Sequence, residues 1–168
     1  MNILITCYNL KAHLHQGENI MTITSFQAAK AMGHFSGWNL SNLKIQKLLY
    51  IAHMLYMGEN NKEPLINEEF EAWDYGPVLP SLYHELKIFG SSSVRDIFFK
   101  ISIPSTNKEI DIIKQTVERL SVVSSSQLVT ITHACGGAWD KNYRQGSRGT
   151  KIPNKDILEE YIKLSGKK

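Results

Sequence analysis

The stretch Leu43-Lys44-Ile45-Gln46-Lys47-Leu48-Leu49-Tyr50-Ile51-Ala52 decides how this chain folds. Its apolar residues are spaced three and four positions apart, and the spacing continues to residue 57, which is typical of a helix with a buried stripe. Ser41 stands before the stretch as a candidate helix cap, and Gly58 follows it. The sequence therefore predicts a central helix over residues 42–57.

Five more helices are predicted around the central one. Four of them begin at a hydroxyl or amide residue that can cap a helix, followed by apolar residues at helical spacing. The remaining helix opens at residues 76–80, where proline suits the first turn because it has no N–H to leave unpaired there. The five helices follow Thr24, residues 76–80, Thr106, Ser124 and Asn154, and they end near residues 33, 89, 120, 134 and 166.

Two segments, residues 65–75 and 97–104, show the alternation of apolar and polar residues that favours strands. Because strands and helices do not alternate regularly along the chain, a parallel doubly wound sheet is not expected. The predicted fold class is mainly α, a single helical domain of about six helices with a small two-stranded β element.

Length and composition are those of one globular domain. The chain has 168 residues and a mass of 19.1 kDa, with 42% hydrophobic and 21% charged residues, which excludes collagen-like and disordered classes. No apolar run approaches the ~18–20 residues of a membrane span. Cys7 and Cys135 show no paired spacing, which favours a reducing, cytoplasmic compartment.

The segment 1–20 differs in character from the rest of the chain. It lacks the basic region and the cleavage site of a signal peptide, and Met21 stands directly before the first predicted helix. Our hypothesis is that Met21 is the native start, so that residues 1–20 are an upstream extension and residues 21–168 form the domain. The alternative is that the apolar residues near the beginning dock on the core or add an edge strand.

Motifs of metal and covalent chemistry are incomplete in this sequence. His84-Glu85 begins like a zinc-protease motif, but Ile88 stands where the second histidine belongs. His133 and Cys135 are two positions apart, which on a helix directs them to different faces. The patterns therefore predict no catalytic residue, no metal site and no cofactor.

Residues 140–155 concentrate positive charge. The segment holds five basic residues against Asp140, and a segment of this kind can contact an acidic partner surface. Arg144, Arg148 and Lys151 are the predicted partner-binding residues, and the alternative is an exposed, solvated loop. The net charge of +3 and the absence of a recognition helix predict weak, non-specific DNA binding at most.

Several segments together resemble one family. They are the stretch quoted above, EAWDYGPVLPSLYHE at residues 71–85, LVTITH at 128–133, Trp139, and KIP at 151–153. In this order and spacing they resemble the Panacea domain family, which contains phage-associated, SocA-like antitoxins of bacterial toxin–antitoxin systems, over residues 21–162. Ile45 and Ile51 stand where leucine and an aromatic residue are commoner in the family, and both keep the helix apolar.

The resemblance implies a helical fold and the neutralisation of a toxin by direct, stoichiometric binding. The toxin would be encoded by a neighbouring gene. A SocA-like variant instead presents its toxin to a protease, which makes a protease the second implied partner. No membrane and no specific nucleic acid are implied as partners.

The residues that carry the resemblance are expected to be mostly structural. We expect Gln46 to bond backbone groups of residues 73–77, Trp73 and Tyr75 to anchor the same corner, and the toxin-facing surface to lie elsewhere. His133 and Trp139 are expected to tie the fifth helix to the loop after it. The full set is Gln46, Lys47, Leu48, Tyr50, Trp73, Tyr75, Gly76, Pro77, Tyr83, His84, His133 and Trp139.

Two other functions stay open from the residues alone. One is a hydrolase-like enzyme that uses His84 and Glu85, or His133, and the other is a weak DNA-binding regulator. Titratable groups that converge in one cleft would favour the enzyme, whereas an exposed apolar patch would favour a protein-binding module.

Overall fold

The computed structural model describes residues 22–105, 107–147 and 149–166. The predicted extension at residues 1–20 and its boundary at Met21 lie outside the described residues, as do Thr106 and Arg148.

The described residues are mainly α-helical, which confirms the predicted fold class. They form seven α-helices, one short 3-10 helix and two strands. In chain order these are α2 (Ser25–Ser36), α3 (Asn42–Glu59), β1 (Glu71–Trp73), β2 (Gly76–Val78), α4 (Pro80–Leu86), η1 (Lys87–Phe89), α5 (Lys108–Leu120), α6 (Ser125–Thr132), α7 (Ala138–Asn142) and α8 (Asn154–Ser165). Among the described residues, no helix is long and apolar enough to cross a bilayer.

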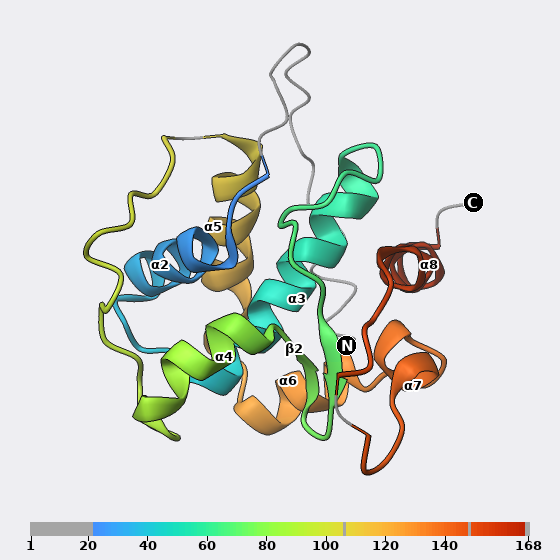
Figure 1. Cartoon of the computed structure of the whole chain (residues 1–168). Coiled ribbons are helices and arrows are strands. Elements are labelled where there is room, and N and C mark those ends of the chain that lie inside the picture. Colours follow the sequence, from blue (N-terminus) through green and yellow to red (C-terminus); the bar gives the residue numbers. More distant parts are fainter. Residues whose placement is uncertain (1–21, 106, 148, 167–168) are drawn as a thin grey trace.

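Helix α3 runs through the centre of the molecule (Figure 1), as the sequence predicted. Helices α2 and α5 pack together on one side of it, and α8 lies on the other. Almost every residue from Ile45 to Met57 is buried, so α3 has no solvent face. The polar residues Gln46, Lys47 and His53, which interrupt the predicted apolar stripe, are buried too.

Capping side chains begin most of the helices as the sequence predicted. Thr24 and Ser124 each form a capping box with the glutamine three residues later, and the Ser41 hydroxyl accepts from the Lys44 amide. Helix α5 is capped by Asn107, and so begins one residue later than the predicted cap would place it.

The cap predicted for the last helix is wrong. Pro153 is the N-cap of α8, and Asn154 is the first residue of the helix. The Asn154 side chain instead faces α3, where its Oδ1 lies 3.0 Å from Nε2 of His53. Burial lowers the pKa of His53 to about 4, so the imidazole is neutral at pH 7. This half-buried contact ties the start of α8 to the central helix.

The predicted pairing of the two strands is also wrong. Only Glu71–Trp73 of segment 65–75 is a strand, and its partner is Gly76–Val78, which the sequence placed at the opening of a helix. Residues 97–104 are irregular and wrap around α2 (Figure 1). Lys30 of α2 donates to the carbonyls of Phe98 (2.9 Å) and Ile101 (2.6 Å). These contacts replace the bonds that a neighbouring strand would have made.

Candidate partner-binding surface

The two strands form an antiparallel hairpin with a two-residue turn. Trp73 pairs with Gly76, so Asp74 and Tyr75 make the turn. Gly76 has a φ of 100°, a conformation that residues with a Cβ rarely adopt. The side chain of Tyr75 is 72% exposed at the tip, so the anchoring role expected of Tyr75 is wrong.

Residues 150–152 cover the outer edge of β1. The Ala72 amide donates to the Thr150 carbonyl over 2.8 Å, and the Ile152 amide donates to the Phe70 carbonyl over 2.7 Å. An edge strand would otherwise leave these groups open to another chain. The segment that sequence analysis interpreted as a polar loop is thus partly docked against the hairpin.

Side chains of α3 cover the outer edge of β2. The ammonium of Lys47 donates to the Pro77 carbonyl over 2.8 Å. The side-chain oxygen of Gln46 accepts from the Leu79 amide, also over 2.8 Å. Gln46 therefore bonds the backbone just beyond the segment expected for it, and Lys47 bonds the backbone within that segment.

Lys47 is a fully buried amine at this edge. A Cβ on Gly76 would lie 2.9 Å from both Nζ of Lys47 and Oγ1 of Thr132, which explains why a residue without a side chain stands at this position. The ammonium bonds a carbonyl, which carries no full charge to offset its own. Burial accordingly lowers the pKa of Lys47 from 10.5 to about 7.

Three stacked rings pack against the turn of the hairpin. His133 lies flat against Trp139, with ring centroids 3.5 Å apart, and Trp139 stacks on Tyr143 at 4.5 Å. The indole N–H of Trp139 donates to the Trp73 carbonyl, and the Tyr143 hydroxyl donates to the Asp74 carboxylate, each over 2.8 Å. The stack therefore holds the turn of the hairpin from residues about 66 positions away in sequence.

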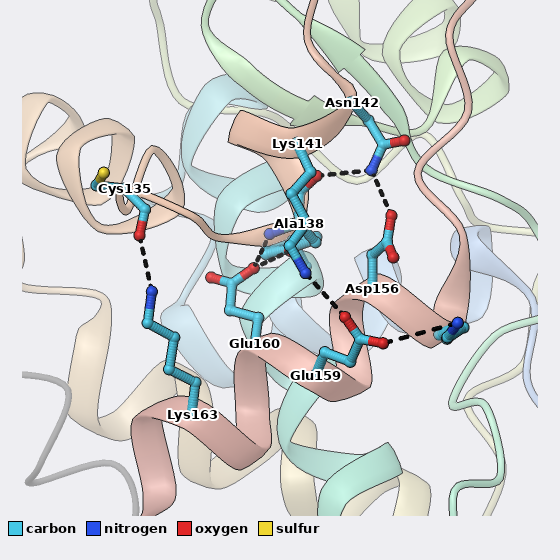
Figure 2. A network of polar contacts seen from close by, with 10 residues as sticks. Cys135, Ala138, Lys141, Asn142, Asp156, Glu159, Glu160 and Lys163 are labelled. Atoms are coloured by element: carbon cyan, nitrogen blue, oxygen red, sulfur yellow. Dashed lines mark hydrogen bonds and ion pairs between the residues drawn. The ribbon is translucent and has the colours of Figure 1, made fainter.

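Helix α7 carries Trp139 and is itself tied to α8 (Figure 2). Four side chains along one face of α8 make the polar contacts: Glu160 with the Ala138 amide, Glu159 with Lys141, Asp156 with Asn142, and Lys163 with the Cys135 carbonyl. Burial raises the pKa of Glu160, whose carboxylate also accepts the hydroxyl of Tyr50 at 2.7 Å. Glu160 thereby joins α3, α7 and α8.

An aromatic patch lies on the exposed side of the hairpin and α4. The ring of Trp73 contacts Tyr83 at 4.9 Å and His84 at 6.5 Å between centroids. His84 and Tyr75 are exposed, and Trp73 and Tyr83 are half-buried. We call Trp73, Tyr75, Tyr83 and His84 the hairpin surface. Tyrosine and tryptophan are enriched in the contacts that dominate protein–protein binding.

The predicted partner-binding residues have different surroundings. Lys151 forms an ion pair with Glu69 beside β1. The guanidinium of Arg144 is exposed and donates to the carbonyls of Lys141 and Tyr143, so its positive charge remains available to a partner. Arg148 lies outside the described residues.

The residues considered for enzymatic chemistry have different surroundings in the structure. His84 and Glu85 are exposed on α4, whereas His133 lies against Trp139 after α6. In the described ranges, no group of three or more His, Cys, Asp or Glu side chains could hold a metal ion.

Comparison with known proteins supports the resemblance seen in the sequence. The family described as "Antitoxin SocA-like, Panacea domain" matches residues 45–140, which run from α3 through the hairpin to α7. The chain is similar to Antitoxin SocA of Caulobacter vibrioides, with 36% identity over 111 residues. That match covers 60% of this chain and 58% of the relative, so the chain spans little more than half the relative's length. No solved structure matches the chain.

Proposed function

Because the chain belongs to the SocA-like antitoxins of the Panacea domain family, we propose that it neutralises a cognate toxin by binding it directly in a stoichiometric complex. The observation that carries the proposal is the family match over α3 to α7. The hairpin surface lies inside this region and exposes large aromatic side chains. The toxin is the product of a neighbouring gene.

In this proposal the toxin contact is the hairpin surface, flanked by Arg144, and not a surface elsewhere as expected from the sequence, because Tyr75 and His84 are exposed. Exposed aromatic rings on a backbone that is already held in place bury area on binding with a small loss of conformational entropy. Arg144 follows Tyr143, whose hydroxyl bonds the turn of the hairpin, so its guanidinium can meet an acidic group at the edge of the same contact.

The test is co-expression of the chain with the protein encoded beside it, followed by co-purification and titration calorimetry. The expected result is rescue of growth and a complex of fixed stoichiometry. The half-life of the toxin distinguishes the two mechanisms. Direct neutralisation leaves it unchanged, whereas delivery to a protease shortens it. A wild-type chain that binds no neighbouring product would overturn the proposal.

Replacing Tyr75 with serine is expected to weaken toxin binding about tenfold or more, because it removes an exposed ring of the proposed contact, at the tip of the hairpin. The fold should be unaffected, since Tyr75 is 72% exposed. Val122→Ser is the matched control, because Val122 is 86% exposed in the turn after α5 and is not part of the hairpin surface. Equal affinities for the two variants in calorimetry would remove the hairpin tip from the interface.

Charge reversal at Arg144 is expected to slow association with the toxin, and to do so most at low salt, because a charge at the rim of an interface mainly steers encounter and salt screens that steering. The melting temperature should stay within a degree or two, as for most surface substitutions. Stopped-flow association at two salt concentrations measures the effect. A rate constant equal to wild type at both concentrations would contradict the role of Arg144.

A further inference from the structure

The outer edge of β2 presents only two backbone groups. Along a strand, the carbonyl of one residue and the amide two residues later point to the same side, and here these are the Pro77 carbonyl and the Leu79 amide. Pro77 itself has no N–H to satisfy. The edge therefore needs one donor and one acceptor.

Gln46 and Lys47 supply this pair from α3. Lys47 donates to the Pro77 carbonyl and Gln46 accepts from the Leu79 amide, so α3 takes the place that a third strand would occupy. The central helix thus fixes β2 directly. The hairpin is then held on three sides: by α3, by residues 150–152, and by Trp139 with Tyr143.

Stability alone does not explain a lysine at this place. A buried amine without a compensating charge destabilises the folded state, and this penalty exceeds the cost of leaving one buried carbonyl without a donor. What an apolar side chain cannot do is bond the Pro77 carbonyl and so define where β2 lies. Lys47 therefore fixes the position of β2 rather than stabilising the fold.

We propose that Gln46 and Lys47 are positioning residues that fix the hairpin surface in its toxin-binding arrangement, an inference that rests on the proposed function. Without them the hairpin takes up several positions, and only a fraction of the molecules is ready to bind. The apparent dissociation constant rises by the inverse of that fraction. The effect falls on the association rate, because the contacts in the finished complex are unchanged.

The first experiment uses the free chain. In Lys47→Met and in Gln46→Met, hydrogen exchange at the Ala72 and Leu79 amides should be at least tenfold faster, while exchange in α5 stays at the wild-type rate. The melting temperature of Lys47→Met at pH 7 should equal or exceed that of wild type. Unchanged exchange in the hairpin would overturn the inference. Equal acceleration in α5, or a lowered melting temperature of Lys47→Met, would also overturn it.

Lys44→Met is the matched control. Lys44 is also on α3 and also donates to a backbone carbonyl, that of Ser121 at 2.9 Å, but this contact holds the turn after α5. The control should leave exchange in the hairpin unchanged. Acceleration there by Lys44→Met would show that any lysine of α3 has this effect, and would overturn the specific role.

The second experiment measures toxin binding by the same variants. Lys47→Met and Gln46→Met should raise the dissociation constant about tenfold, mainly through slower association. Gln46→Glu keeps an oxygen for the Leu79 amide but loses the donor that Gln46 gives to Oδ1 of Asn42, so it should recover most, but not all, of the affinity lost in Gln46→Met. Wild-type affinity in both methionine variants would overturn the inference. Failure of the wild-type chain to bind would overturn the proposed function, and the exchange data would still decide whether these residues hold the hairpin.

Discussion

The free energy of unfolding is expected to rise by about 3–4 kcal/mol between pH 7 and pH 10, because burial in the folded state favours the neutral amine of Lys47 over the ammonium. The pKa of Lys47 is about 7 when folded and 10.5 in its ordinary environment. Between these values the unfolded chain binds a proton that the folded chain has released. Stability therefore increases with pH across this window, by up to ~1.4 kcal/mol per pH unit.

Other buried groups set the limits of this window. The Tyr56 hydroxyl is bonded to Glu109, and burial raises its pKa above 10, so stability falls once unfolded tyrosine ionises. His53 has a pKa of about 4 when folded, against 6.5 ordinarily, which makes stability rise with pH between those values. Glu160 acts in the opposite direction, since its raised pKa favours the folded state at acid pH.

Urea unfolding at a series of pH values measures the effect, and Lys47→Met identifies its source. The variant cannot titrate at position 47, so its stability should be nearly flat between pH 7 and pH 10. Lys44→Met should keep the wild-type slope, because this variant retains Lys47. A wild-type slope that survives in Lys47→Met would show that another group causes it.

The central helix could be predicted from the sequence, and so could a backbone contact of Gln46 near the hairpin, but the matching role of Lys47 could not. Periodicity identifies α3 because apolar residues dominate it, and by the same rule it assigns polar residues to a solvent face. Gln46 and Lys47 are buried because their partners are backbone groups 33 and 30 residues away. Nothing local in the sequence shows that a distant strand edge needs a donor and an acceptor.

The hairpin could not be predicted from the sequence, because its strands are short and contain residues that are uncommon in strands. Its strands have three residues each, and one contains Gly76 and Pro77, residue types that normally argue against a strand. Its turn, Asp74-Tyr75, lacks the Asn-Gly or Asp-Gly signal of common hairpins. Residues 97–104 show clearer alternation, but carbonyls of this segment are satisfied by Lys30. In both places, side chains such as Lys30 and Lys47 bond backbone groups that a neighbouring strand would otherwise have bonded.

The residues of the hairpin surface were singled out from the sequence, but as structural residues, and the toxin-facing surface was expected elsewhere. The family resemblance singled out Trp73, Tyr83, His84 and Trp139, and the structure brings the first three into one aromatic cluster and Trp139 against the backbone of Trp73. The role of Glu160 could not be predicted, because in the sequence it is one of several acidic residues of the last helix. Its role follows from burial between Tyr50 and α7.

Truncation of Trp139 to alanine is expected to destabilise the fold by about 3–5 kcal/mol, as for other buried tryptophans. Trp139 is 8% exposed, and its ring separates His133 from Tyr143 in the stack. Its loss also leaves the Trp73 carbonyl without its indole donor. Against a typical total of ~5–15 kcal/mol, the change removes a large share of the stability and frees the turn of the hairpin.

Trp139→Phe separates the two parts of this effect. Phenylalanine keeps a ring in the stack but has no N–H for the Trp73 carbonyl, so it should cost about 1–2 kcal/mol. In that variant, hydrogen exchange should accelerate at the hairpin amides more than in α5, because the lost bond reaches the hairpin directly. Urea unfolding of both variants, with exchange measured on Trp139→Phe, tests this division. Equal losses of stability in the two variants would mean that the indole N–H, rather than the stacked ring, is what holds α7 to the hairpin.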